Sequence, residues 1–244
     1  MHPSHKMRPL AAFRAMRRLL NDREDTSQVF VITSSLRGKS SLRGTQRLRT
    51  TEAGRAVLAE NRSLLPVLCD RAALARLPAG SLGRSYYDFV TREAISAEGL
   101  VEASLVQKKF PAPTADEQLF RERIRDMHDL CHVLTGYGRD PFGETCLVAF
   151  TYAQILSLGL AVITLLGTIK ISKAVPNAPV RLAVLEAWRH GRAAAWLAGE
   201  DVEAMMRAPL EELRARLGIA PPERYREIMA GLASGQITPV PSLQ

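Results

Sequence analysis

The chain has few of the residues that mark several common protein classes. Its 244 residues include only three cysteines, Cys69, Cys131 and Cys146, which are widely spaced and form no Cys-x-x-Cys pair. An odd, scattered set argues against a disulfide scaffold and for free thiols in a reducing compartment. We interpret Cys131 and Cys146 as small buried core residues, with a stray metal ligand as the alternative.

Other missing sequence features exclude further classes of protein. Aromatic residues make up only 6% of the chain, and no zinc-finger, RRM or homeodomain pattern is present, so nucleic acid is not an expected partner. The first ten residues, MHPSHKMRPL, lack the apolar core of a secretory signal. No strand-like alternation of useful length and no internal repeat occurs, which favours an all-α fold.

Acidic residues are scarce in the N-terminal part. Residues 1–55 contain twelve Lys and Arg but four Asp and Glu, whereas the remainder contains 21 of each sign, so the whole net charge of +8 is N-terminal. Such an excess suggests contact with an anionic partner. We favour anionic lipid at a membrane surface, because Leu10–Leu20 reads as an amphipathic helix with Arg14, Arg17 and Arg18 on it. A solvated basic surface is the alternative.

Charged residues are also missing from Thr145 to Ile169, a run of 25 residues. This length could span a bilayer. Polar side chains and two glycines interrupt the run, so we favour a buried core helix or the wall of a lipid-tail pocket.

The remaining pattern predicts one helical domain. We expect a disordered tail over residues 1–8, a single all-α domain over residues 9–232 and a flexible C-terminal tail over residues 233–244. Capping residues and apolar periodicity predict these helices besides Leu10–Leu20: Val29–Leu36, Thr51–Leu64, Asp70–Arg76, Ser85–Arg92, a long helix from Thr114 or Asp116 to Leu134, Val180–Leu197, Pro209–Leu217 and Tyr225–Leu232.

The strongest local signal lies at the end of the long helix. His128 and His132 are four residues apart, so they share one face of a helix, and Asp129 is adjacent. Glu144 follows His132 after eleven residues, and Asp140 is the expected cap of the helix that carries it. Glycines punctuate the intervening turn: Gly136, Gly138 and Gly143. The motif thus falls on two adjacent helices joined by a Gly-rich turn, with Glu144 able to point back at the imidazoles.

Two imidazoles and two carboxylates suit a divalent ion. The ligand set favours zinc, with iron or another first-row ion as an alternative. We therefore predict His128, Asp129, His132 and Glu144 as metal ligands. An accidental pair of helical histidines is the competing interpretation.

At these residues the chain resembles the family of the fourth Coq protein of ubiquinone (coenzyme Q) biosynthesis. The pattern His-Asp-x-x-His, eleven residues, Glu is similar to the metal motif of that family. Three flanking segments add to the resemblance: Asp25–Phe30, Leu77–Phe89 and Glu186–Ile219.

The resemblance implies a metal-dependent enzyme of ubiquinone biosynthesis. The implied reaction is oxidative decarboxylation of a polyprenylated aromatic acid, in which a hydroxyl replaces the ring carboxyl at C1. The four ligands would act through the metal, and Arg125 would assist the substrate carboxylate. The prenyl tail would lie against the Thr145–Ile169 wall.

The resemblance also implies a homodimer, other ubiquinone-biosynthesis proteins as partners, and a cytoplasmic protein held peripherally at the inner membrane. A rival interpretation is a non-catalytic, lipid-binding scaffold that organises a biosynthetic complex. A metal phosphohydrolase of the HD type fits less well, since its ligands are dispersed and those of this chain form one compact block.

Overall fold

The protein is described by a computed structural model that covers residues 5–21, 27–103, 112 and 114–240. These residues form helices and no strand, apart from an isolated bridge between Ser81 and Pro209, which confirms the all-α prediction. The elements are: α1 (Pro9–Asn21), α2 (Ser27–Ser35), α3 (Ser40–Leu48), α4 (Glu52–Ala59), α5 (Leu65–Cys69), α6 (Arg71–Ala75), α7 (Leu82–Arg92), α8 (Ala97–Ala103), α9 (Ala115–Thr135), α10 (Pro141–Ile155), α11 (Leu158–Ala174), α12 (Val180–Ala193), the short 3-10 helix η3 (Leu197–Gly199), α13 (Val202–Met205), α14 (Leu210–Leu217) and α15 (Glu223–Ala233).

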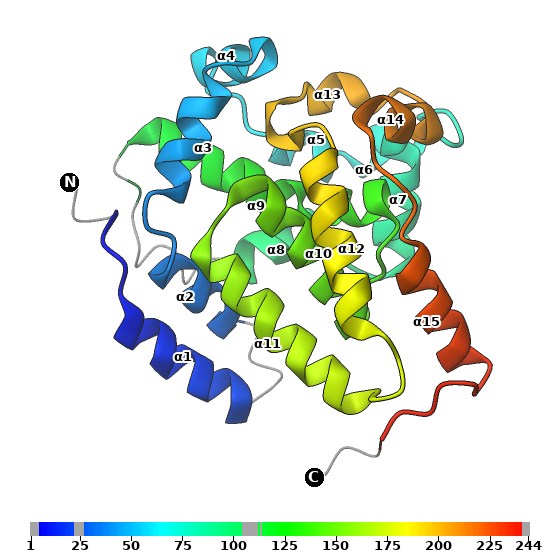
Figure 1. Ribbon diagram of the computed structural model, residues 1–244. Coiled ribbons are helices and arrows are strands. Elements are labelled where there is room, and N and C mark those ends of the chain that lie inside the picture. Colours follow the sequence, from blue (N-terminus) through cyan, green and yellow to red (C-terminus); the bar gives the residue numbers. More distant parts are fainter. Residues whose placement is uncertain (1–4, 22–26, 104–111, 113, 241–244) are drawn as a thin grey trace.

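The long helix α9 runs through the middle of the fold (Figure 1). It begins where the Thr114 hydroxyl accepts a hydrogen bond from the Glu117 amide at 3.2 Å, and it ends at Gly136, whose φ of 78° is left-handed. A threonine cap and a left-handed glycine are the expected signals for these two ends. Helix α9 therefore carries both histidines of the motif in its last two turns.

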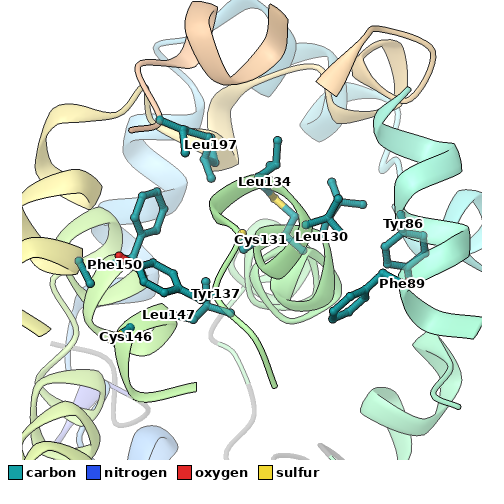
Figure 2. Close-up of a cluster of buried hydrophobic side chains, with 14 of the residues drawn as sticks. Tyr86, Phe89, Leu130, Cys131, Leu134, Tyr137, Cys146, Leu147, Phe150 and Leu197 are labelled. Carbon is teal, nitrogen blue, oxygen red and sulfur yellow. The ribbon is translucent and has the colours of Figure 1, made fainter. Parts of the chain in front are cut away.

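The main hydrophobic core surrounds α9 (Figure 2). Tyr86 and Phe89 of α7 lie on one side of the helix, and Leu147 and Phe150 of α10 lie on the other. Helix α12 packs closely on α10, because a Cβ at Gly191 would lie 2.3 Å from the Phe150 carbonyl oxygen. The motif is thus built on rigid, well-packed helices.

The two motif-flanking cysteines are core residues. Cys131 is 8% exposed and Cys146 is fully buried. Burial raises the pKa of the Cys131 thiol to about 12, so this thiol stays protonated at neutral pH. This confirms the interpretation of both as core residues.

The uncharged run divides into two helices with different surroundings. Helix α10 is largely buried, whereas Gly159 is the one buried residue of α11. The break falls at Leu156, which adopts a left-handed φ of 53°. Among the described residues, no helix is both long and apolar enough to cross a membrane. The expectation of a buried helix therefore holds for α10 and is wrong for α11.

Helices α1, α2 and α11 form an outer layer with its own small hydrophobic cluster, which includes Ala12, Ile32 and Val162. Figure 1 shows this layer beside the main body. Helix α11 lies close to α2, since a Cβ at Gly159 would lie 2.5 Å from the Thr33 Cα.

Both segments expected to be tails contact the domain where they are described. The buried His5 lies 3.1 Å from a carboxylate oxygen of Glu117, and the Arg8 amide donates to the Ser35 carbonyl. At the other end, the Val240 amide donates to the Ala174 carbonyl at 2.8 Å. Residues 1–4 and 241–244 lie outside the described part.

Several helix boundaries differ from the prediction. The helix expected over Thr51–Leu64 ends at Ala59, because Asn61 takes a left-handed φ of 48°. The helix expected over Val180–Leu197 ends at Ala193, since Ala194 is extended. Four short helices, α3, α5, α8 and α13, were not predicted. Helix α8 begins after Ser96, whose hydroxyl accepts a hydrogen bond from the Gly99 amide at 3.1 Å, so this cap signal was overlooked.

Candidate metal centre

The two histidines of α9 lie one turn apart with their rings nearly perpendicular. Their ring centroids are 5.0 Å apart. His132 is buried, and its Nδ1–H donates to the Tyr137 carbonyl at 3.0 Å, because a carbonyl can only accept. A neutral imidazole then carries a lone pair on Nε2. That nitrogen is buried and has no hydrogen-bond partner among the described residues.

Glu144 reaches both histidines from the neighbouring helix. Its Oε2 lies 3.4 Å from the His128 Nε2, and its Oε1 lies 3.4 Å from the His132 Nε2. One carboxylate oxygen thus faces each imidazole. The position follows from the start of α10, where Asp140 Oδ1 caps the amides of Phe142 and Gly143 at 3.0 Å.

Asp129 completes the set from the same turn of α9. It is buried, and ligand atoms of His128, Asp129 and His132 all lie within 4.8 Å of one another. Glu144 approaches the histidines from α10 and lies outside that tight trio. The donors are two imidazole nitrogens and carboxylate oxygens, which is a set that zinc and other first-row ions accept. The unpartnered, buried Nε2 of His132 is the feature that fits such an ion best.

The electrostatics of the site favour charge separation between the two helices. Burial alone would raise the pKa of Glu144, but its contacts with His128 and His132 hold that pKa far below the ordinary 4.5. Burial would lower the pKa of His128, yet the Glu144 contact raises it above the ordinary 6.5. Without a metal, the carboxylate therefore stays ionised and His128 readily takes a proton.

Arg125 is engaged with a neighbouring acid. Its Nε donates to Asp126 Oδ1 at 2.7 Å, and its Nη2 lies 2.6 Å from the same oxygen. Asp126 is buried, and its Oδ2 has no hydrogen-bond partner among the described residues. The predicted role of Arg125 toward a substrate carboxylate stays a prediction.

Two hollows lie beside the motif. The larger, about 280 Å³, is lined by Phe89, Arg92, His132 and Arg214 among others. The smaller, about 40 Å³, ends at His128 and is otherwise mostly apolar, with Met127, Phe150 and Leu197 in its wall. His132 thus lines the wider hollow, which includes charged residues, and His128 lines the narrow, mostly apolar one.

Comparison with known families now adds to this geometry. Residues 6–223 match the family described as Coenzyme Q (ubiquinone) biosynthesis protein Coq4. The chain belongs to the Coq4 family. The match covers the whole motif and most of the chain, which confirms the resemblance seen in the sequence.

Curated relatives carry the same family name. The chain is 28% identical over 182 residues to the "Ubiquinone biosynthesis protein COQ4 homolog, mitochondrial" of Rattus norvegicus, which covers 72% of this chain and 64% of the relative. It is 27% identical over 177 residues to the "Ubiquinone biosynthesis protein coq4, mitochondrial" of Talaromyces stipitatus, covering 72% of this chain and 58% of the relative. The chain thus spans less than two thirds of the length of these Coq4 relatives.

A solved structure shares the fold. The crystal structure of a protein from Nostoc punctiforme aligns with a TM-score of 0.67 at 21% identity, covering 88% of this chain and 99% of that chain. At this identity the likeness concerns the fold alone. The helical arrangement described above is therefore one that a crystal structure also shows.

The structure adds residues around the Coq4 motif that the sequence analysis did not select. Phe89 stacks on the His132 ring with centroids 5.6 Å apart; it ends the segment Leu77–Phe89, so the resemblance could have pointed to it. The Arg214 guanidinium donates to the carbonyls of Val133 and Leu134 at the end of α9. Tyr225 contacts the turn between α9 and α10, and no sequence signal marked it.

Proposed function

We propose that this Coq4-family chain binds a divalent first-row ion, zinc foremost, through His128, Asp129, His132 and Glu144. We further propose that it acts in ubiquinone biosynthesis on a polyprenylated aromatic acid, replacing the ring carboxyl at C1 with a hydroxyl. The buried and unpartnered Nε2 of His132 is the observation that carries the metal assignment. A buried imidazole nitrogen without a partner is costly, and an ion would satisfy it.

The chain's own groups prepare the site for that chemistry. The Tyr137 carbonyl fixes the tautomer of His132, so its Nε2 lone pair faces the other ligands. Burial opposes ionisation of Glu144, but its contact with His128, which can carry a proton on Nε2, lowers its pKa and keeps the carboxylate charged. A bound ion would supply a Lewis acid that can hold a substrate carboxylate and polarise it. The oxidative step needs O₂ or another oxidant as co-substrate.

The apolar crevice at His128 supports a lipid-like substrate. Its wall combines α9, α10 and η3, with Ile124, Phe150 and Ile155 among its residues. A prenyl tail leaving the ring would follow this wall, which is the α10 part of the uncharged run. At about 40 Å³ the crevice is smaller than an aromatic ring needs, so substrate entry requires α9 and α10 to separate slightly. The second candidate function is a lipid-binding scaffold without catalysis, which the exposed apolar side chains of α11 favour.

The outer layer supports attachment to an anionic membrane surface. Helix α11 is the most apolar helix near the surface, and Leu158, Leu165 and Ile169 on it are exposed. Helix α1 exposes Leu10 and Phe13 and has no acidic residue along its length. Exposed apolar side chains beside basic ones are typical of helices that lie in a lipid interface.

Three arginines on α1 supply the complementary charge. Arg14, Arg17 and Arg18 are exposed, and each basic residue near an anionic surface contributes about 1 kcal/mol. A second copy facing this surface would place like charges against each other, so we assign the face to lipid. Peripheral attachment at the inner membrane, a homodimer through another face, and other ubiquinone-biosynthesis proteins as partners complete the proposal.

The first experiment measures the metal content of protein purified without chelators. We expect about one zinc or iron per chain in the wild type, and none in His132→Ala. His190→Ala is the matched control, because this histidine lies on α12 away from the motif. Full occupancy in His132→Ala, or no metal in the wild type, would exclude the assigned site.

The second experiment tests the reaction. Wild type and Glu144→Ala are incubated with a prenylated hydroxybenzoate in detergent under air, and the decarboxylated, hydroxylated product is measured. Product with the wild type alone supports the enzyme. A wild type that binds metal and the prenylated acid but forms no product supports the scaffold.

The third experiment tests the lipid face by vesicle sedimentation. We expect binding to anionic vesicles, weakened by salt and reduced at least about fivefold for each of Arg14→Glu and Arg17→Glu, since each change removes one positive charge and adds a negative one. Arg55→Glu on α4 makes the same change of charge elsewhere and should bind as the wild type does. Equal loss in all three variants would show that net charge, not this face, drives the binding.

A further inference from the structure

Tyr225 of α15 contacts the turn that joins the two motif helices. We propose that it is a positioning residue of the metal centre, which sets ion affinity by holding the turn from outside the motif. The inference rests on the proposed ion site. Tyr225 lies beyond residues 6–223, the part of the chain that matches the Coq4 family.

The hydroxyl of Tyr225 bonds to the turn at two points. It accepts a hydrogen bond from the Gly138 amide at 3.0 Å and donates one to Asp140 Oδ2. The other oxygen of Asp140 caps the amides of Phe142 and Gly143 at 3.0 Å. Tyr225 therefore orients the carboxylate that starts α10.

That start determines where Glu144 lies. The Glu144 amide donates to the Asp140 carbonyl at 2.9 Å, so the ligand follows the cap within one helical turn. A rotation of Asp140 would carry Glu144 with it. Tyr225 thus influences the position of Glu144 through Asp140.

Tyr225 also influences His132, through the same turn. The His132 Nδ1–H donates to the carbonyl of Tyr137, which belongs to the same turn. The Tyr225 ring packs against Tyr137 with centroids 5.5 Å apart and against Phe142 at 5.3 Å. Tyr225 therefore packs against the same turn that fixes the tautomer of His132.

The contact is too close to be incidental. A Cβ at Gly138 would lie 2.5 Å from the Tyr225 hydroxyl oxygen and 2.8 Å from Asp140 Oδ2. Burial and Asp140 both raise the pKa of Tyr225, so the phenol keeps the proton that it donates. Tyr225 itself is 7% exposed. Outer partners that hydrogen-bond a ligand directly typically change metal affinity by about 10–100-fold, and Tyr225 acts one bond further out, through Asp140 and the turn.

The test compares Tyr225→Phe with Tyr137→Phe. Both variants lose one phenolic hydroxyl within the same aromatic cluster. The Tyr137 hydroxyl is buried and has no hydrogen-bond partner among the described residues, so its removal should leave the site intact. We expect Tyr225→Phe to bind Zn²⁺ about 10-fold more weakly, the lower end of that range, in competition with a chromophoric chelator, and Tyr137→Phe to bind as the wild type does.

Two further readouts separate positioning from simple loss of stability. The urea midpoint of the metal-free protein reports stability. The ¹⁵N shifts of the His132 ring in metal-free protein at pH 8 report its tautomer, which should lose its Nδ1–H preference in Tyr225→Phe only. Wild-type affinity and tautomer in Tyr225→Phe would overturn the inference while the proposed ion site stands. If the wild type binds no Zn²⁺, the proposed site fails, and with it the claim about affinity.

Discussion

Adding one methyl group at Gly143 should disturb both the fold and the metal centre. Gly143 precedes Glu144 in the first turn of α10. A Cβ there would lie 2.1 Å from the Gly138 carbonyl oxygen and 2.7 Å from its carbonyl carbon. Non-bonded heavy atoms settle roughly 3.5 Å or more apart, so the turn and the helix must separate by over about 1 Å. Both partners are backbone, and no side-chain rotation can relieve the clash.

The size of the effect follows from two opposing contributions. Overpacking of this kind typically costs about 1–3 kcal/mol, whereas replacing a helical glycine with alanine gains about 0.5–1 kcal/mol. We expect Gly143→Ala to lose roughly 1–2 kcal/mol, which corresponds to a Tm lower by about 2–8 °C for a chain of this size. Ion sites tolerate only about 0.5 Å of displacement. Zinc affinity should therefore fall more steeply than stability.

The assay is urea unfolding of the metal-free protein together with zinc titration. Gly99→Ala on α8 is the matched control, because among the described residues its Cβ would meet only the Ser96 hydroxyl, at an ordinary 3.6 Å. That variant should be as stable as the wild type or more so, with unchanged zinc affinity. If Gly143→Ala keeps wild-type stability and wild-type affinity, the close approach of the turn does not hold the site, and the reasoning is wrong.

Three more predictions concern the pH response of the site and the packing of the core. Zinc affinity should fall on acidification from above pH 6.5, because a proton competes for His128, whose pKa is raised; a flat titration between pH 8 and 6 would contradict this. In metal-free protein, the raised pKa of His128 contributes stability that is lost as the pH rises through that pKa. The lowered pKa of Glu144 contributes stability that is lost as the pH falls below 4.5. Urea midpoints should therefore show the full contribution of this pair between about pH 4.5 and 6.5. Leu147→Ala in the core should cost about 2–5 kcal/mol of unfolding free energy, whereas Leu182→Ala on the exposed face of α12 should stay within about 0.5 kcal/mol; equal losses would contradict the core assignment.

The sequence was sufficient for the motif because its signals are local. Thr114 caps α9, Asp140 caps α10, and Pro141 begins it, and each acts through amides within three residues. Spacing on one helix placed His128 and His132 together without any knowledge of the fold. The short Gly-rich turn then brings the next helix back beside α9, so Glu144 can face the two histidines.

The supports of the motif were not predictable in this way. Tyr225 and Asp140 are 85 residues apart, and Arg214 reaches Leu134 across 80. These bonds exist because α14 and α15 pack at the end of α9, and that packing is a property of the whole core. A tyrosine in a polar C-terminal helix carries no local sign that its hydroxyl ends at a turn.

The uncharged run Thr145–Ile169 shows a second limit of prediction from sequence. Composition cannot distinguish a helix that is buried in the core from an apolar helix that is partly exposed. Helix α10 packs between α9 and α12 and is largely buried, whereas α11 packs against α2, α10 and α12 yet leaves Leu165 59% exposed. Both helices are predominantly apolar, with charges only at Glu144 in α10 and at Lys170 and Lys173 near the end of α11, and such a composition is typical of helices with little solvated surface. For α10 the protein core meets this requirement. For α11 we propose that a lipid surface meets it, since the basic residues of α1 lie in the same layer. A Cβ at Gly167 of α11 would lie 2.5 Å from the hydroxyl of Thr145, so the exposed helix packs closely against the residue that follows Glu144.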